Sequence, residues 1–170
     1  NKTYKQDTFP LPEPLISKSV GKIVGTDGQR KMSKSLGNTI GIFEDEAVIR
    51  KQIMSSFTDP NRKKATDPGR VEGNPVFVYH ELLNDNVAEL EDLKARYRAG
   101  AVGDVEVKEK LFAAHQRYFA DARDRRKELQ TNLDLARQIL ADGAQKAGVL
   151  ANQTLLEVYK TIGIQNTLNK

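Results

Sequence analysis

A basic pentapeptide holds the residues whose types and spacing best suit catalysis in this chain: Lys31-Met32-Ser33-Lys34-Ser35. Two lysines three residues apart can follow the charge of a departing polyphosphate, while serine hydroxyls and backbone N–H groups donate hydrogen bonds to its oxygens. Glycines lie on both sides and allow positive φ at little cost, at Gly25, Gly28 and Gly37. A charged loop of this composition is also a common solvated feature of protein surfaces. The five residues alone therefore leave two interpretations open, a polyphosphate-binding loop and an ordinary surface loop.

The wider sequence favours the first interpretation. The pentapeptide is identical to the KMSKS signature of class I aminoacyl-tRNA synthetases, and later segments resemble the tryptophanyl-tRNA synthetases in their order along the chain. These segments are Thr58-Asp59-Pro60-Asn61-Arg62, Asp67-Pro68-Gly69, Glu72-Gly73-Asn74-Pro75-Val76-Phe77, Arg98-Ala99-Gly100-Ala101-Val102-Gly103 and Asp142-Gly143-Ala144. The resemblance runs from about Phe9 to Gly163 and implies that this chain is part of a tryptophan–tRNA ligase.

The resemblance implies a role for each residue of the loop. Lys31 and Lys34 would stabilise the transition state in which the tryptophan carboxylate attacks the α-phosphate of ATP and pyrophosphate leaves. Ser33 and Ser35 would donate hydrogen bonds to phosphate oxygens, and Met32 would pack the loop or contact the adenine through its backbone. Magnesium would arrive with ATP, held mainly by the phosphates. A metal site built from protein side chains is not expected.

The sequence before the loop does not read as the start of a nucleotide-binding domain. Neither His80 nor His115 occurs in the His-x-Gly-His arrangement of this enzyme class, and no strand–turn–helix repeat precedes the loop. We therefore expect residues 1–40 to end a Rossmann-like catalytic domain that is absent from this chain, with an extended segment, one short strand at 20–24 and the lysine loop. In the family the backbone near Ile23 lies beside the adenine. The chain alone is expected to be inactive.

Helical periodicity dominates the remaining sequence and predicts a mainly α fold. Residues 41–170 are interpreted as a C-terminal domain of five or six helices, which in the family binds the anticodon arm of tRNA. Asn74, followed by proline, and Asn86 are suited to begin helices as N-caps. The predicted helices cover residues 45–57, 74–83, 86–100 and 104–130. Another begins at Thr131 or Asn132 with a break or kink near Gly143 and Gly148, and a last one ends at Gly163.

Positive charge is concentrated in the first part of the chain. Residues 1–72 contain 13 Lys and Arg against 9 Asp and Glu, whereas residues 73–170 contain 14 of each kind. Arg62, Lys63 and Lys64 lie in the basic part. They suit either contacts with tRNA phosphates or a solvated basic loop.

A second basic cluster lies on the predicted helix 104–130. Arg123 and Arg126 are candidates for contact with the anticodon arm. Acidic residues alternate with these arginines, at Asp121, Asp124 and Glu128. This alternation favours ion pairs along the helix surface over contact with tRNA.

Composition excludes several classes of protein. The chain has no cysteine, so it can form neither disulfides nor thiolate metal sites. No apolar run approaches the roughly 20 residues of a membrane span, and no signal peptide is apparent. These features predict a cytoplasmic protein.

The resemblance also implies partners. They are tRNA(Trp), tryptophan, ATP, the missing catalytic half and, in the full-length enzyme, a second identical subunit. Because the family's dimer contact lies mainly in that half, this chain alone is expected to be a monomer. Two alternatives remain, another class I synthetase such as the tyrosyl enzyme, and a helical RNA-binding module with a chance basic loop.

Overall fold

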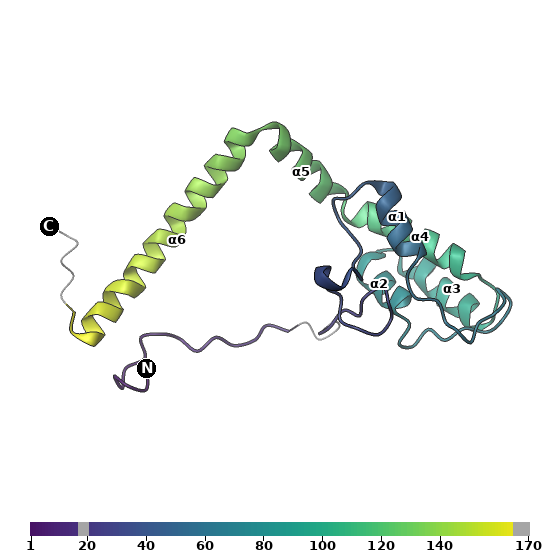
Figure 1. Cartoon of the computed structure of the whole chain (residues 1–170), viewed down its shortest axis with the longest axis horizontal. Helices are drawn as coiled ribbons and strands as arrows, with labels where there is room; N and C mark the ends of the chain where they lie inside the picture. The colour runs from purple at the N-terminus through teal and green to yellow at the C-terminus, as the bar shows by residue number, and fades with distance from the viewer. Residues whose placement is uncertain (17–20, 165–170) are drawn as a thin grey trace. The chain divides into compact units, whose positions relative to one another are not determined.

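The structure is a computed structural model, which describes residues 1–16 and 21–164 of the 170-residue chain (Figure 1). Six α-helices lie within these residues, which confirms the mainly helical class. They are α1 (Glu46–Met54), α2 (Pro75–Leu83), α3 (Val87–Arg98), α4 (Asp104–Tyr118), α5 (Ala120–Thr131) and α6 (Leu133–Ile162). The lysine loop contains one 3-10 turn, η1 (Lys34–Leu36). The chain divides into two compact units, one of residues 17–126 and one of residues 1–16 and 127–170.

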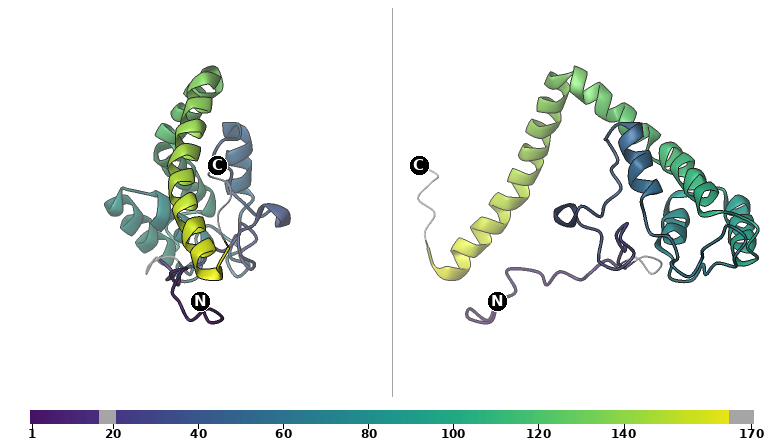
Figure 2. Two further views of the ribbon diagram at one scale, coloured as in Figure 1. Left: turned by 90° about the vertical axis from the view of Figure 1, so that its left-hand side faces the viewer. Right: turned by 45° about the vertical axis from the view of Figure 1, so that its right-hand side comes forward.

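The core of the 17–126 unit lies among the first four helices. Helix α4 packs against α1 and α2, and α2 also contacts α3, as the views in Figures 1 and 2 show. The rings of Phe77 and Tyr97 meet edge to face with their centroids 4.9 Å apart. The largest fully buried side chains are Tyr97, Phe77, Ile49, Ile53, Leu93, Leu111, His80, His115 and Val107. These residues form the platform on which the lysine loop sits.

Three helices begin where the sequence predicts. Asn74, Asn86 and Asn132 each accept a hydrogen bond on the side-chain oxygen from a backbone N–H in the first turn, at 3.0–3.1 Å. Such caps satisfy a donor that has no partner inside the helix. Local chemistry alone therefore specifies these boundaries.

The predicted helix 104–130 is wrong in one respect, because it is divided at Phe119. The backbone there leaves the helical conformation, with φ −100° and ψ 11°. The Phe119 ring packs against His115 at a centroid distance of 4.8 Å. The guanidinium of Arg123 donates to the carbonyl of Gln116, which in a continuous helix would pair with the N–H of Ala120. Ring packing and this arginine cap stabilise a break that periodicity does not encode.

Of the break or kink predicted near Gly143 and Gly148, a break is wrong, because α6 runs without interruption through both. No atom lies within 4 Å of the position a Cβ would take at either glycine, so neither marks a close contact. A glycine inside a helix costs about 1 kcal/mol relative to alanine, which 30 residues of helical hydrogen bonding tolerate. Gly163 ends the helix with φ 73°, as expected.

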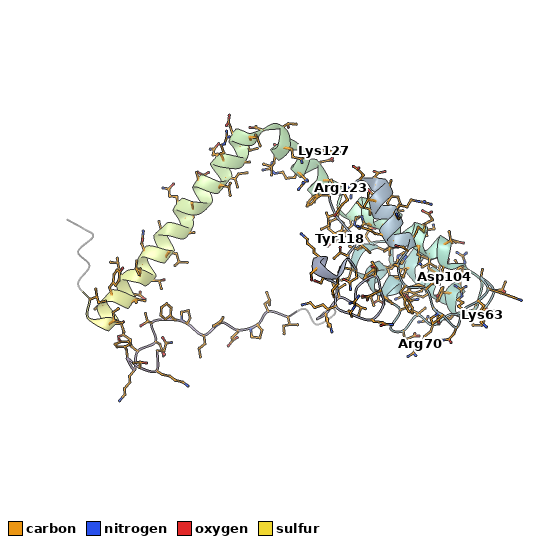
Figure 3. All side chains as sticks on the ribbon, in the orientation of Figure 1. Lys63, Arg70, Asp104, Tyr118, Arg123 and Lys127 are labelled. Carbon is orange, nitrogen blue, oxygen red and sulfur yellow. The ribbon has the colours of Figure 1, made fainter. Side chains whose placement is uncertain are left out.

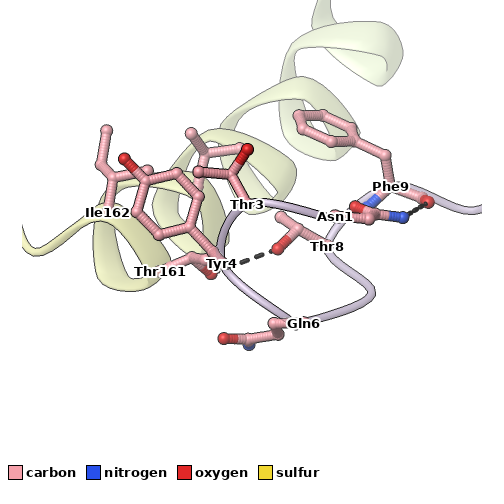
Figure 4. A pocket seen from close by; sticks show the side chains of 9 residues that line it. Asn1, Thr3, Tyr4, Gln6, Thr8, Phe9, Thr161 and Ile162 are labelled. Atoms are coloured by element: carbon pink, nitrogen blue, oxygen red, sulfur yellow. Dashed lines mark hydrogen bonds between the residues drawn. The ribbon is translucent and has the colours of Figure 1, made fainter.

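The unit of residues 1–16 and 127–170 joins the start of the chain to the end of α6. Thr8 and Thr161 share a hydrogen bond of 3.2 Å between their hydroxyls (Figure 4). The Asn1 side chain closes the turn by donating to the carbonyl of Phe9 at 2.7 Å. A hollow of about 210 Å³ lies between this turn and α6.

The predicted strand at residues 20–24 begins outside the described residues. In the described part it is reduced to one antiparallel bridge, between Val24 and Lys31. A strand needs neighbours to satisfy its backbone groups, and this segment has only the returning arm of its own loop. The Tyr79 hydroxyl donates to the Val24 carbonyl at 2.6 Å and holds the bridge on α2.

Within the described residues, none of the helices combines the length and the apolar character that crossing a membrane requires. The predicted domain division between residues 40 and 41 stays a prediction.

Candidate nucleotide-binding loop

The lysine loop grows from a short antiparallel pair. The Val24–Lys31 bridge is continued by a hydrogen bond from the Met32 N–H to the Ile23 carbonyl, at 2.9 Å. On its other side the Gly25 N–H donates to the Arg30 carbonyl at 2.7 Å. Two arms of the chain are therefore fixed side by side, and the loop projects beyond them.

The loop presents its polar groups to solvent. Lys31, Lys34 and Ser35 are exposed, and among the described residues neither lysine ammonium has an ion-pair partner. The hydroxyls of Ser33 and Ser35 lie 2.9 Å apart. Gly37 closes η1 in the left-handed conformation at φ 66°. Two uncommitted cations and two hydroxyls on one exposed turn can contact a polyanion.

Ile23 and Met32 occupy the inner side of the loop. Both are partly buried against the core. Their side chains are therefore committed to packing, which leaves their backbone groups as the candidates for contact with a base. The prediction that these two positions lie beside adenine remains a prediction.

Arg126 approaches the loop from α5. Its guanidinium lies 4.8 Å from the centroid of the Phe43 ring. Arg126 and Phe43 line an open hollow of about 580 Å³ together with Lys34 and Met32. The structure therefore places two cations, 92 residues apart in sequence, around one hollow. No sequence signal could have found this proximity, because it depends on the position of α5.

The structure buries Arg62, and the predicted contact of this residue with tRNA stays a prediction. Its side chain is only 1% exposed and forms an ion pair with Asp104 at 3.0 Å. The guanidinium also donates to the carbonyl of Asp67 at 2.7 Å and lies 4.2 Å from the centroid of the Tyr97 ring. Arg62 is therefore buried inside the loop between α1 and α2, with its guanidinium engaged by Asp104 and by backbone carbonyls.

The two lysines that follow Arg62 differ from it in exposure. Lys63 and Lys64 are exposed, and their backbone N–H groups donate to the Asp67 carboxylate at 3.0 and 2.8 Å. Figure 3 shows Lys63 on the same end of the unit as Asp104 and Arg70. Arg62 therefore stabilises the loop between α1 and α2, and Lys63 and Lys64 remain candidates for phosphate contact.

The histidines act as core residues. The ring Nε2 of His80 lies 2.9 Å from the Val107 carbonyl, and the side chain is fully buried. Burial lowers the pKa of His80 below its usual value of 6.5. His115 is buried too, and burial together with nearby Arg123 lowers its pKa. Both histidines therefore belong to the interior of this unit, at 0% and 1% exposure.

Acid is expected to destabilise the fold through these rings. Because the pKa values are depressed in the folded state, the unfolded chain binds protons first as the pH falls below about 6.5, so stability is lost. We expect the melting temperature to fall between pH 7.5 and pH 5. In a His80→Gln variant, which keeps a donor for Val107, the fall should be smaller. Equal falls in the two proteins would contradict this account.

Comparisons with known proteins identify the family of this chain. A family model described as tRNA synthetases class I (W and Y) matches residues 1–120. The chain therefore belongs to the class I tRNA synthetases of the tryptophan and tyrosine type.

Two relatives with similar sequences are tryptophan–tRNA ligases. One from Borreliella burgdorferi is 46% identical over 170 residues, and one from Treponema pallidum is 43% identical over 164 residues. These alignments cover 99% and 96% of this chain but 48% of each relative. The chain thus spans about half the length of the curated relatives it matches. The resemblance seen in the sequence is confirmed.

A solved structure has a similar fold. The tryptophanyl-tRNA synthetase from Campylobacter jejuni, crystallised with ADP and tryptophan, is 35% identical and gives a TM-score of 0.75. The match covers 93% of this chain and 48% of that one.

Proposed function

We propose that this chain supplies the mobile lysine loop and the helical tRNA-binding part of a tryptophan–tRNA ligase. The complete enzyme activates tryptophan with ATP, releases pyrophosphate, and transfers the tryptophanyl group to tRNA(Trp). The observation that carries the proposal is the solvent-exposed Lys31–Ser35 loop on a rigid base, in a chain 46% identical to a tryptophan–tRNA ligase. Residues 1–40 end the catalytic domain, and residues 41–170 form the helical domain.

The loop would act on the phosphates of ATP. As the tryptophan carboxylate attacks the α-phosphate, negative charge grows on the bridging oxygen and on the departing pyrophosphate. The ammonium groups of Lys31 and Lys34 stabilise this charge, and the hydroxyls of Ser33 and Ser35 donate to phosphate oxygens. Magnesium enters as part of the ATP substrate. Because neither lysine ammonium has an ion-pair partner among the described residues, both are available for this contact.

In this proposal, exposed lysine and arginine side chains contact the tRNA phosphates. Lys63 and Lys64 lie on the loop between α1 and α2, and Arg126 lies beside the lysine loop. Arg123 caps α4 through Gln116, so its contribution is smaller than that of Arg126. The complete enzyme is a cytoplasmic homodimer in this proposal, and this chain alone is a monomer without activity.

The test is amino-acid-dependent exchange of pyrophosphate into ATP. The complete synthetase that contains this chain should exchange with tryptophan and not with tyrosine, and the 170-residue chain alone should not exchange. Exchange driven by tyrosine would keep the chemistry and replace the substrate. Absence of exchange with both amino acids, together with RNA binding that is indifferent to ATP, would favour a helical RNA-binding module instead.

A further inference from the structure

Asn38 is buried beneath the exposed lysine loop. Asn38 is 3% exposed, although the loop that precedes it faces solvent. The side-chain Oδ1 accepts a hydrogen bond from the Ser33 N–H at 2.8 Å. The side-chain Nδ2 donates to the Lys31 carbonyl at 3.2 Å and to the Asp27 carboxylate at 2.9 Å. One amide therefore joins the base of the loop to two positions within the basic pentapeptide.

Asp27 fixes the orientation of this amide. Its carboxylate accepts from the backbone N–H groups of Gln29 and Arg30, both at 3.0 Å. These two N–H groups, followed by the Asn38 amide, hold the pKa of the Asp27 carboxyl well below its usual range, so it only accepts hydrogen bonds. The Asn38 Nδ2 must therefore face Asp27, and its Oδ1 must face the N–H of Ser33. A rotated amide would lose all three contacts.

Gly25 provides the space that Asn38 occupies. A Cβ at Gly25 would lie 2.0 Å from Asn38 Nδ2 and 2.3 Å from its Cγ. Gly25 does not have a positive φ, so its backbone conformation does not require glycine. The position requires glycine because a side chain there would clash with Asn38. Two features thus specify the position of the Asn38 amide: its hydrogen bond to the Asp27 carboxylate, and the space left by the missing side chain at Gly25.

The contact at Ser33 extends to Lys34 through the backbone. Ser33 directly precedes η1, and its carbonyl accepts from the Leu36 N–H at 3.2 Å. The Lys34 carbonyl accepts from the Gly37 N–H at 3.1 Å. A displacement at Ser33 therefore moves the turn that carries Lys34.

We propose that Asn38 is the positioning residue of the lysine loop: its amide holds the Lys31 carbonyl and the Ser33 N–H so that both ammonium groups meet the departing pyrophosphate. This inference rests on the proposed function and adds a residue outside the pentapeptide to it. Asn38 touches no substrate in this arrangement. It acts on the reaction only through the two lysines, at the step where charge develops.

The test compares four variants in the complete synthetase: Asn38→Ala, Asn38→Asp, Asp27→Asn with Asn38→Asp, and Lys34→Ala. Asn38→Ala should lower kcat of tryptophan-dependent exchange about tenfold and leave KM for tryptophan within twofold, because loss of the hydrogen bonds to Lys31 and Ser33 loosens only the loop. Asn38→Asp should lower kcat further, since the new carboxylate faces Asp27. The double variant restores a donor opposite that carboxylate and should recover part of the loss.

Asn74→Ala is the matched control. Asn74 is also a buried asparagine, and it caps α2 away from the lysine loop. The control should melt at a lower temperature with kcat unchanged. In the 170-residue chain, hydrogen exchange of the Ser33 amide should become faster in Asn38→Ala and stay unchanged in Asn74→Ala.

The outcomes distinguish a failure of the positioning role of Asn38 from a failure of the proposed function of the loop. If Lys34→Ala lowers kcat and Asn38→Ala does not, or if kcat does not recover at all in the double variant, the positioning role is wrong while the proposed function stands. If Lys34→Ala exchanges at the normal rate, the proposed function of the loop fails, and the role of Asn38 fails with it.

Discussion

Lys34→Ala in the complete synthetase is expected to lower kcat for tryptophan-dependent pyrophosphate exchange about 100-fold, which corresponds to about 3 kcal/mol. Lys34 is exposed on a short turn, and within the described residues its ammonium makes no ion pair. Its backbone is held by the turn, and no ion pair neutralises its charge within the described residues. Such a group contributes most where negative charge develops, so the transition state should lose more than the bound ATP does.

The measurement is steady-state exchange over a range of ATP concentrations. A change in KM for ATP of less than about fivefold, beside the large fall in kcat, would separate transition-state stabilisation from simple binding. Lys51→Ala is the control, because Lys51 is an exposed lysine on α1 outside the loop. Equal losses in kcat and in ATP binding would count against the proposed role of Lys34.

The sequence specified the boundaries that depend on local chemistry. Asn74, Asn86 and Asn132 begin helices because each side chain caps the first turn that follows it, which needs no information from distant residues. The loop was predictable for the same reason, since the glycines and lysines that produce it all lie between Gly25 and Gly37. The division at Phe119 was not predictable, because it depends on packing against His115 and on a cap from Arg123.

The residues missed by sequence reasoning are polar side chains that turn inward. Asn38 and Asp27 look like ordinary turn residues, and only the folded loop brings them 2.9 Å apart. Lys108 looks like an exposed helix residue, yet it is 4% exposed and its ammonium donates to the Ser56 carbonyl at 2.7 Å. Charge in a sequence therefore predicts contact with a polyanion only where the structure leaves that charge exposed.

Arg62→Met is expected to lower the free energy of unfolding of the 17–126 unit by about 3 kcal/mol, the lower end of the range for breaking a buried ion pair. The guanidinium pairs with Asp104 at the start of α4 and donates to the Val102 carbonyl just before that helix. It also donates to the carbonyls of Ala65 and Asp67 in the loop between α1 and α2. Methionine keeps much of the packing over Tyr97 but leaves Asp104 Oδ2 and these carbonyls without the guanidinium donor, while Asp104 Oδ1 still accepts from the Tyr97 hydroxyl at 2.9 Å. The lower end of the range applies because Asp104 stays 23% exposed and can gain water.

Urea denaturation followed by the near-UV signal of tyrosine measures this effect, because Tyr79 and Tyr97 are buried in this unit. Lys63→Met is the control, and its unfolding free energy should stay within about 0.5 kcal/mol of the unsubstituted chain, since Lys63 is exposed.

The variants Arg62→Met and Lys63→Met also distinguish a residue that stabilises the fold from a residue that binds tRNA, when both are made in the complete enzyme. Lys63→Met should weaken tRNA binding and reduce its salt dependence without a loss of stability. A stable Arg62→Met variant with weakened tRNA binding would show that Arg62 leaves its buried position to contact tRNA.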